Sequence, residues 1–510
     1  MKKIFLLLAN LIMCSFSAQS INNLAWFKNY GGTGEDYGYS IKKTPDNGYI
    51  ILGASNSNNN DITNNHGQDD IVLIKLDQNK NIVWQKSYGG SKREWLQTSK
   101  TLQITEDGGF IFASTTNSND GDVVRQSSAE ASIWIVKVDS QGNIQWQNSL
   151  PVTSGASAVK VIPNEGYIIA GSGFSPNNFR LAKLDLTGNI LWQKSYSVPY
   201  YTEVSDVQLY NSGFILIGTK DTAQSSSGTP DCELRVINVD MNGGVIWEKN
   251  YVYQNYTKNS PKTVMVNPDG TLLITAVIGM TYSSVYKGLL LKLDALGNTV
   301  WQKEFPGSED SHFTITSSII SQNNEYILSG TKADHYPNDI SDFWFGKFDI
   351  NGNVISQQVI RGNSNYDYAN EIIEEGNNQF TVLGSSASGS LRNIISFFPP
   401  QIQVLMTLSN KGNTDMVLFK LSDVLTLDTK EISKSGGFKI YPNPVKNIIN
   451  IKSDKRISTV NIYAADGKLV SQHHEDNIKL IDASSLMIGN YFIEIIDSNN
   501  IKTFKKIIKK

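Results

Sequence analysis

The sequence predicts an all-β protein: a seven-bladed β-propeller followed by a small Ig-like β-sandwich. Three observations support this fold class. Two short phrases recur along the first four fifths of the chain at a period of about 50 residues, which is typical of propeller blades. Only 18% of the 510 residues are charged and 40 are glycine, a composition that favours short strands joined by turns. Near residue 438 the recurring phrases stop and a different pattern begins.

The first phrase joins a Lys-Leu-Asp strand end to a strand with a central tryptophan. In its first full copy it runs from Lys75 to Asp77 and continues from Asn81 to Lys86, and it returns at 137–147, 183–194, 238–249, 292–303 and 347–358. Its aromatic position is occupied by Trp26, Trp84, Trp146, Trp192, Trp247 and Trp301, and finally by Ser356. A second phrase, Asp-x-Gly followed by an apolar run, begins at Asp46 and precedes each copy of the first.

Each repeat predicts four strands, called A to D in chain order, at 39–43, 49–52, 71–76 and 82–88 in the first unit. Strands B and C are continuous apolar runs, so we expect both of their faces to be buried. Strand D alternates, with Trp84 and Tyr88 on one face. Tandem β-sandwiches would need about 100 residues per unit, so a period of about 50 favours propeller blades.

The strand count also predicts how the ring closes. A copy of strand D, Leu24 to Tyr30, precedes the first strand A, and the seventh unit ends after its strand C at 417–421. The N-terminal strand 24–30 should therefore pair with 417–421, completing the last blade and removing an open sheet edge.

The ends of the chain predict export. Residues 1–20 contain Lys2 and Lys3, an apolar run and small residues near Ala18, the pattern of a signal peptide too short to span a membrane stably. We expect the propeller at 21–423, a linker at 424–437 and the second domain at 438–510. The net charge of −3 argues against a nucleic-acid binder that works by bulk charge, and two cysteines argue against a disulfide scaffold. No other apolar run reaches transmembrane length.

The last domain contains four characteristic phrases in a fixed order. They include Tyr441, Pro442, Asn443 and Pro444, then Gly467 and Lys468, then Gly489 and Tyr491, and a final Lys-Ile-Ile-Lys-Lys. This domain resembles the type A C-terminal sorting domain of type IX secretion substrates from Bacteroidetes-type bacteria. The resemblance implies passage through the periplasm, export by the type IX machinery, and removal of the domain by a sortase-like peptidase. It further implies release, or attachment through surface lipopolysaccharide. The preceding region resembles secreted bacterial propeller-like repeat proteins, which implies a fold and no particular activity.

Candidate ligand sites are few. Six of the nine tryptophans occupy the strand D position, which favours packing between blades, whereas Trp95 lies in a D–A loop and is a candidate for ligand contact. Phe397 and Phe398 belong to an apolar insertion at 385–416, which could be a structural excursion that packs down on the propeller, plug the ring centre, cover a sheet edge or bind a partner. Asn-rich B–C loops hold carboxylates that could bind Ca²⁺ or act as ordinary turn residues: Asp61, Asp69, Asp70, Asp120 and Asp122.

No nucleophile, zinc or phosphate-loop motif is present in the sequence, so we expect no catalytic residues and no cofactor other than calcium. The leading interpretation is an exported binding, adhesion or scaffold module, with extracellular glycans among its candidate ligands. The alternative is a hydrolase or lyase acting on extracellular polysaccharide, whose paired carboxylates would come from different blades. In either case we expect the site on the face that carries the long D–A and B–C loops.

Overall fold

The computed structural model describes most of the chain. The described residues are 24–125, 130–151, 155–174, 177–197, 202–221, 232–253, 258–279, 286–305, 311–334, 340–362, 367–376, 378–387, 390–394, 403–407, 411–422, 438–453, 455–464, 469–487, 489–498 and 502–510. The predicted signal peptide and the predicted linker lie outside them. The chain divides into two compact units, the first ending at Ser422 and the second comprising 394–402 and 423–510.

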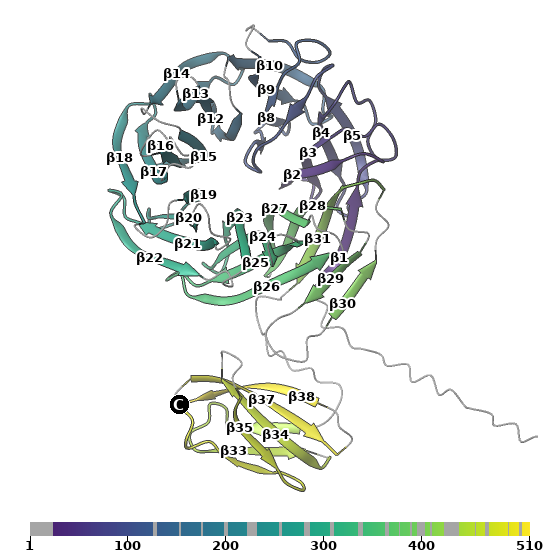
Figure 1. Cartoon of the computed structure of the whole chain (residues 1–510), viewed down its shortest axis with the longest axis vertical. Helices are drawn as coiled ribbons and strands as arrows, with labels where there is room; N and C mark the ends of the chain where they lie inside the picture. Colours follow the sequence, from purple (N-terminus) through teal and green to yellow (C-terminus); the bar gives the residue numbers. More distant parts are fainter. Residues whose placement is uncertain are drawn as a thin grey trace, which may run out of the picture. The chain divides into compact units, whose positions relative to one another are not determined.

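The first unit consists of antiparallel sheets arranged around a centre, as Figure 1 shows. Its described residues form seven such sheets, which we call blades 1 to 7. Blade 1 contains β2 (Asp36–Lys43), β3 (Tyr49–Ser55), β4 (Asp70–Leu76) and β5 (Ile82–Tyr88), which are strands A to D of the first sequence repeat. The sequence interpretation as an all-β propeller is confirmed.

The same strand order recurs in blades 2 to 5, except that two short strands, β6 and β7, pair with β8 in place of a single strand A in blade 2. Blade 2 contains β6 (Glu94–Trp95), β7 (Leu102–Ile104), β8 (Phe110–Thr116), β9 (Ser132–Val138) and β10 (Ile144–Pro151). Blade 3 contains β11 (Ala156–Ile162), β12 (Gly166–Phe174), β13 (Asn177–Leu184) and β14 (Ile190–Ser197). Blade 4 contains β15 (Thr202–Tyr210), β16 (Gly213–Asp221), β17 (Cys232–Asp240) and β18 (Val245–Tyr251). Blade 5 contains β19 (Lys258–Val266), β20 (Leu272–Gly279), β21 (Tyr286–Leu293) and β22 (Thr299–Phe305).

The last two blades depart from this order. Blade 6 contains β23 (Ser311–Ile320), β24 (Tyr326–Asp334), β25 (Ile340–Phe348) and β26 (Val354–Gly362), and then β29 (Ser390–Ile394) and β30 (Gln403–Thr407). Blade 7 contains β27 (Asp367–Gly376), β28 (Gln379–Ser386), β31 (Asp415–Ser422) and β1 (Leu24–Tyr30). The described strands of the insertion, β29 and β30, thus extend the outer edge of blade 6, which is one of the roles that the sequence allows.

The N-terminal strand completes blade 7. β1 pairs antiparallel with β31, with Phe27 opposite Phe419 and Tyr30 opposite Met416. The two aromatic rings of Phe27 and Phe419 lie 6.0 Å apart. This is the pairing that the sequence predicts, and it joins the start of the propeller to its end and covers the edge of β31.

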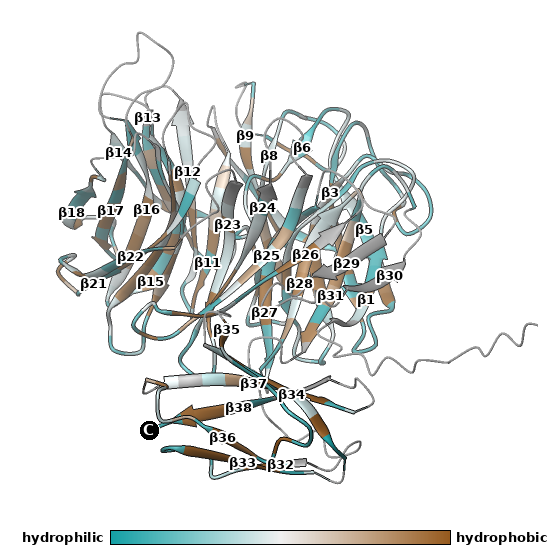
Figure 2. Cartoon of the chain, turned by 60° about the horizontal axis from the view of Figure 1, so that its bottom comes forward, coloured by the Kyte–Doolittle hydropathy of each residue, from teal (hydrophilic) through white to brown (hydrophobic). Residues whose placement is uncertain are grey.

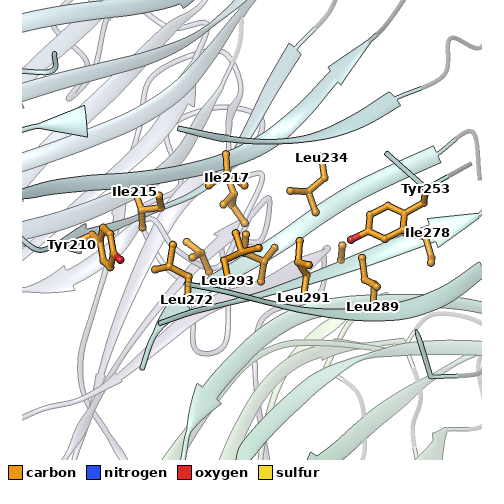
Figure 3. Close-up of a cluster of buried hydrophobic side chains, with 14 residues drawn as sticks. Tyr210, Ile215, Ile217, Leu234, Tyr253, Leu272, Ile278, Leu289, Leu291 and Leu293 are labelled. Carbon is orange, nitrogen blue, oxygen red and sulfur yellow. The ribbon is translucent and has the colours of Figure 1, made fainter. Parts of the chain in front are cut away.

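Hydrophobic packing between blades forms the core. Every residue of β3, β4, β8 and β9 is buried, as continuous apolar strands predict. Figure 3 shows one cluster between blades 4 and 5, in which Ile215 and Ile217 face Leu289, Leu291 and Leu293. Figure 2 shows hydrophobic residues along the strands and hydrophilic residues in many of the connecting loops.

The recurring tryptophan connects each blade to the next. The Nε1–H of Trp146 donates to Leu186 O at 3.2 Å, in the C–D turn of the following blade. The glycine of that turn, Gly188, has φ +86°, and a Cβ added to it would lie 2.5 Å from the Trp146 ring. Blade 1 has Lys80 at the corresponding turn position, with φ +66°, and its ammonium lies 4.8 Å from the Trp26 ring centroid. The prediction that these tryptophans pack between blades is therefore confirmed.

The lysine of the Lys-Leu-Asp phrase pairs with the turn between strands A and B. Lys75 Nζ lies 2.8 Å from Asp46, and Lys137 Nζ lies 2.7 Å from Asp107. The hydrogen bond from Lys75 lowers the pKa of Asp46 to about 2. Because both recurring phrases contribute to this contact, their repetition along the sequence reflects one repeated ion pair.

The second unit is a two-sheet sandwich, as the sequence predicts. One sheet contains β32 (Phe438–Tyr441), β33 (Ile448–Ser453) and β36 (Leu480–Asp482). The other contains β35 (Leu469–His474), β34 (Ile457–Ala464), β37 (Gly489–Asp497) and β38 (Lys502–Lys509). The two sheets enclose a separate core that includes Val445, Ile462, Ile493 and Ile507.

Candidate functional site

Two similar loop assemblies form the part of the long-loop face that holds most of the candidate residues. Each consists of a Tyr-Gly-Gly D–A loop, beginning at Tyr30 or Tyr88, and the B–C loop of the blade that follows it, blade 1 or blade 2. Side chains of the B–C loop accept hydrogen bonds from the Gly-Gly loop backbone. Thr33 N donates to Asn59 Oδ1 at 2.8 Å, and Ser91 N donates to Asp120 Oδ1 at 2.8 Å. Because these bonds fix the backbone, the loops are held in a defined shape.

The five aspartates considered for calcium have individual roles in these assemblies. Asp61 accepts from Gly31 N and forms an ion pair with Lys411, whereas its counterpart Asp122 accepts from Gly89 N at 3.4 Å. Asp120 accepts from both the backbone and the hydroxyl of Ser91. Asp69 pairs with Arg93 Nε at 2.6 Å. The structure therefore shows each of these four as a turn or ion-pair residue.

Asp70 differs from the other four because it is fully buried. Its Oδ2 accepts from the backbone N–H of His66 at 2.9 Å and lies 2.7 Å from His66 Nδ1. Its Oδ1 is buried and has no hydrogen-bond partner among the described residues. No group of three or more His, Cys, Asp or Glu side chains suited to a metal ion occurs among the described residues. Calcium binding stays a prediction.

Two pairs of buried carboxyl groups lie beneath the Gly-Gly loops, and each pair joins adjacent blades. Asp415 of blade 7 and Asp36 of blade 1 both flank Gly31, since a Cβ on that glycine would lie 2.9 Å from Asp415 Oδ1 and 2.6 Å from Asp36 Oδ2. Asp70 and Glu94 flank Gly89 in the same way, each with an oxygen 2.5 Å from that Cβ position. All four side chains are 0% exposed.

Burial raises the pKa of Asp36, Asp415, Asp70 and Glu94, because a carboxylate loses its hydration inside the protein. Within the described part of the chain, Asp415 Oδ1, like Asp70 Oδ1, is buried without a hydrogen-bond partner. Sequence reasoning did not identify these pairs, since their members come from different blades. The only available signal was the acidic residue four positions after each second glycine of the loop, Asp36 and Glu94.

The aromatic candidates have different outcomes. The prediction that Trp95 lies in a D–A loop is wrong, because Trp95 belongs to the short strand β6 and pairs with Thr115 of β8. Its side chain is half-buried, and Arg93, two residues earlier, is exposed. Phe397 and Phe398 lie outside the described residues.

A cavity of about 60 Å³ between blades 2 and 3 is lined by Ile133, Leu150 and Arg180 among others. Small-molecule sites usually measure about 300–1,000 Å³, so this cavity is not a ligand pocket of that kind.

The four phrases of the last domain lie at its strand ends and turns. The first phrase spans the end of β32 and the turn after it, with Tyr441 as the last residue of the strand, followed by Pro442, Asn443 and Pro444. Asn443 Oδ1 accepts a hydrogen bond from Ile508 N at 2.9 Å. Gly489 begins β37 opposite Lys509, and Tyr491 is buried with its hydroxyl donating to Met487 O at 2.9 Å. Gly467 and Lys468 lie outside the described residues. The first phrase is thus bonded to the last strand, so the module folds as one unit.

Comparison with known proteins identifies the last domain. The fold defines an all-β protein made of a propeller and a sandwich. Residues 439–510 match the family described as the secretion system C-terminal sorting domain. The chain is a type IX secretion substrate, handled by that machinery and sent to the cell surface or the extracellular space. No helix that could span a bilayer occurs in the described part of the chain. No curated protein matches the chain.

Several solved structures resemble the propeller unit at low identity. A protein of unknown function from Dyadobacter fermentans is 11% identical, with a TM-score of 0.39 over 78% of this chain and 98% of that one. The β-propeller domain of the Trilobed protease from Pyrococcus furiosus is 8% identical, with a TM-score of 0.41 over 75% and 98%. A Synechocystis apocarotenoid oxygenase is 12% identical, with a TM-score of 0.41 over 76% and 97%. At these scores the activities of those proteins have no bearing on this chain.

Proposed function

We propose that the protein is a non-catalytic binding module for extracellular glycans, delivered by its sorting domain. The observation that carries this proposal is the rigid loop surface formed by the two Gly-Gly assemblies. Their internal hydrogen bonds use the loop backbone, while Lys92, Arg93 and Trp95 remain at least partly exposed. An amphipathic ring beside cationic and amide groups is suited to a polyhydroxylated ligand, and the loops are rigid enough to present them without a large entropy cost.

The buried carboxyl pairs support binding over hydrolysis. Glycoside hydrolysis requires two carboxyl groups on either side of a glycosidic bond, both in contact with substrate. The two buried carboxyl pairs are close together and have raised pKa values, as such groups do. Their side chains, however, are 0% exposed and lie against Gly31 or Gly89. Their position between blades favours a structural role.

Binding of the full chain to an array of bacterial and extracellular glycans tests this proposal. We expect binding to a subset of glycans, and a loss of about tenfold or more in affinity in Trp95→Ala, since a buried aromatic contact is a typical hot spot. The matched control is Leu296→Ala, which removes a side chain that is 68% exposed in a C–D turn. Loss of binding in the control alone would contradict the proposed face, and release of reducing ends from a bound glycan would contradict the non-catalytic assignment.

We further propose that the exported protein is cleaved before residue 438 by a sortase-like peptidase and is released or attached to lipopolysaccharide. The support is the separate core of residues 438–510, which allows the sorting domain to leave without disturbing the propeller core. Mass spectrometry of the surface and medium fractions checks this directly. A mature protein that retains 438–510 would contradict it.

A further inference from the structure

The innermost segments of several blades carry charged side chains that interact electrostatically from one blade to another. The innermost strands contact one another in the ring order β2, β7, β11, β15, β19, β23 and β27. Figure 1 labels β2, β15, β19, β23 and β27 around the centre. Three lysines belong to the inner segments of three consecutive blades: Lys42 in β2, Lys100 just before β7 and Lys160 in β11. We call these residues the axial lysine cluster. The acidic residues that interact with them electrostatically are Asp206 of β15 and Glu371 of β27.

Both acidic residues are already engaged with the edges of inner strands. Glu371 Oε1 lies 2.5 Å from Lys42 Nζ, and its Oε2 accepts from Ser40 Oγ and from Ile41 N. Asp206 accepts from Val207 N at 2.8 Å and, across to the next blade, from Val264 N at 3.1 Å. These bonds satisfy backbone donors that an inner edge strand would otherwise leave unpaired.

Lys100 and Lys160 differ from Lys42 because, among the described residues, no carboxylate lies within ion-pair distance of their ammonium groups. Within the described residues, neither ammonium forms a hydrogen bond or an ion pair, and both side chains are half-buried. Burial lowers the pKa of both lysines, while Asp206 and Glu371 act against that decrease. The neighbouring charge of Lys42 lowers both pKa values further, and Lys100 does the same to Lys160. The two lysines lie on adjacent chain segments, because Lys100 O accepts a hydrogen bond from Val159 N at 2.9 Å. Two partly dehydrated ammonium groups on adjacent segments cost free energy unless an anion neutralises them.

We propose that Lys100 and Lys160 form an oxyanion-binding site at the centre of the propeller. Two ammonium groups without an ion-pair partner in the described part of the chain offer up to six N–H donors in a partly dehydrated setting, which suits a compact group with several acceptor oxygens. A sulfate group meets this description, either as the free ion or as the ester of a sulfated glycan. The site uses residues of the inner strands and not the Gly-Gly loop assemblies, so this proposal goes beyond the proposed function.

Isothermal titration of the full chain with sodium sulfate tests the site, with sodium chloride at matched ionic strength as the reference. We expect the wild-type chain to bind sulfate, and the double variant K100Q/K160Q to bind it at least about tenfold more weakly, since two charge-assisted contacts are removed. The matched control K194Q/K452Q removes two exposed lysines and should bind as the wild type does. The variant K100R/K160R keeps both charges and should retain binding.

A parallel titration with a sulfated disaccharide and its unsulfated form identifies the source of the group. Binding of the sulfated form with the same loss in K100Q/K160Q would assign the site to a sulfated glycan, and binding of inorganic sulfate alone would assign it to the free ion. Failure of the wild type to bind either probe, or unchanged affinity in K100Q/K160Q, would overturn the proposal. Thermal melts establish folding, and the single variants K100Q and K160Q, each expected to weaken binding, replace the double variant should it not fold.

Discussion

Substituting Gly188 by alanine tests how consecutive blades interlock. Gly188 has φ +86°, a conformation that costs an alanine about 1 kcal/mol. Its new Cβ would lie 2.5 Å from Cε3 of Trp146, so the indole must move. That shift would break the 3.2 Å hydrogen bond from Trp146 to Leu186 O, worth about 1 kcal/mol, and reduce packing in the same interface. We therefore expect Gly188→Ala to lower the free energy of unfolding by about 2–4 kcal/mol.

Gly270→Ala provides the matched control for this experiment. Gly270 has φ +79°, close to that of Gly188, but nothing lies within 4 Å of its Cβ position. Its substitution should cost only the conformational term of about 1 kcal/mol. Urea denaturation followed by tryptophan fluorescence measures both variants. If the two free energies of unfolding agree within about 0.5 kcal/mol, the tryptophan contact does not constrain the turn and the reasoning is refuted.

Three further predictions concern buried charge and export. Because burial raises the pKa of Asp36 and Asp415, the folded state holds protons that the unfolded chain releases, so this pair's contribution to stability should fall as pH rises from about 4 through the raised pKa values. Asp415→Asn should flatten this pH dependence and be more stable than the wild type at pH 8. Urea midpoints of the variant that change with pH as steeply as those of the wild type would contradict this. Asp107→Ala removes the carboxylate that pairs with Lys137, whose side chain is 3% exposed, and should lower the free energy of unfolding by about 1–3 kcal/mol. Lys137→Met leaves only a half-exposed aspartate without its partner and should cost less. The reverse order of the two variants in the same denaturation assay would contradict a stabilising ion pair. Removing residues 438–510 should leave a folded propeller in the periplasm, and immunoblots showing normal amounts of the truncated protein in the medium would contradict the sorting assignment.

Much of the propeller could be predicted from sequence because its repeats record local requirements. Strands B and C are apolar on both faces, and turn residues such as Asp139 and Gly142 recur between strands C and D. The role of Trp146 was also predictable in kind, since a repeated buried aromatic indicates packing. Its hydrogen bond to Leu186 was not, because the acceptor is a backbone carbonyl of the next repeat and leaves no trace in residue type.

The features around the two junctions and the ring centre were less predictable. Asp36 and Asp415 lie near opposite ends of the propeller sequence and meet only because the ring closes. Lys100 and Lys160 occupy different positions in their inner strands, so no repeated phrase marks them. Asp70 could be identified as a candidate oxygen ligand, but its burial beside Glu94 depends on the packing of β4 against β6.

The most direct test of the account is the removal of β1. Without residues 24–30, blade 7 lacks its outer strand and β31 exposes an unpaired edge in the full chain. We expect the shortened chain to melt below the wild-type temperature and to associate through that edge, as measured by calorimetry and by sedimentation velocity. A chain lacking β1 that melts at the wild-type temperature and remains monomeric would contradict a propeller closed by its N-terminal strand.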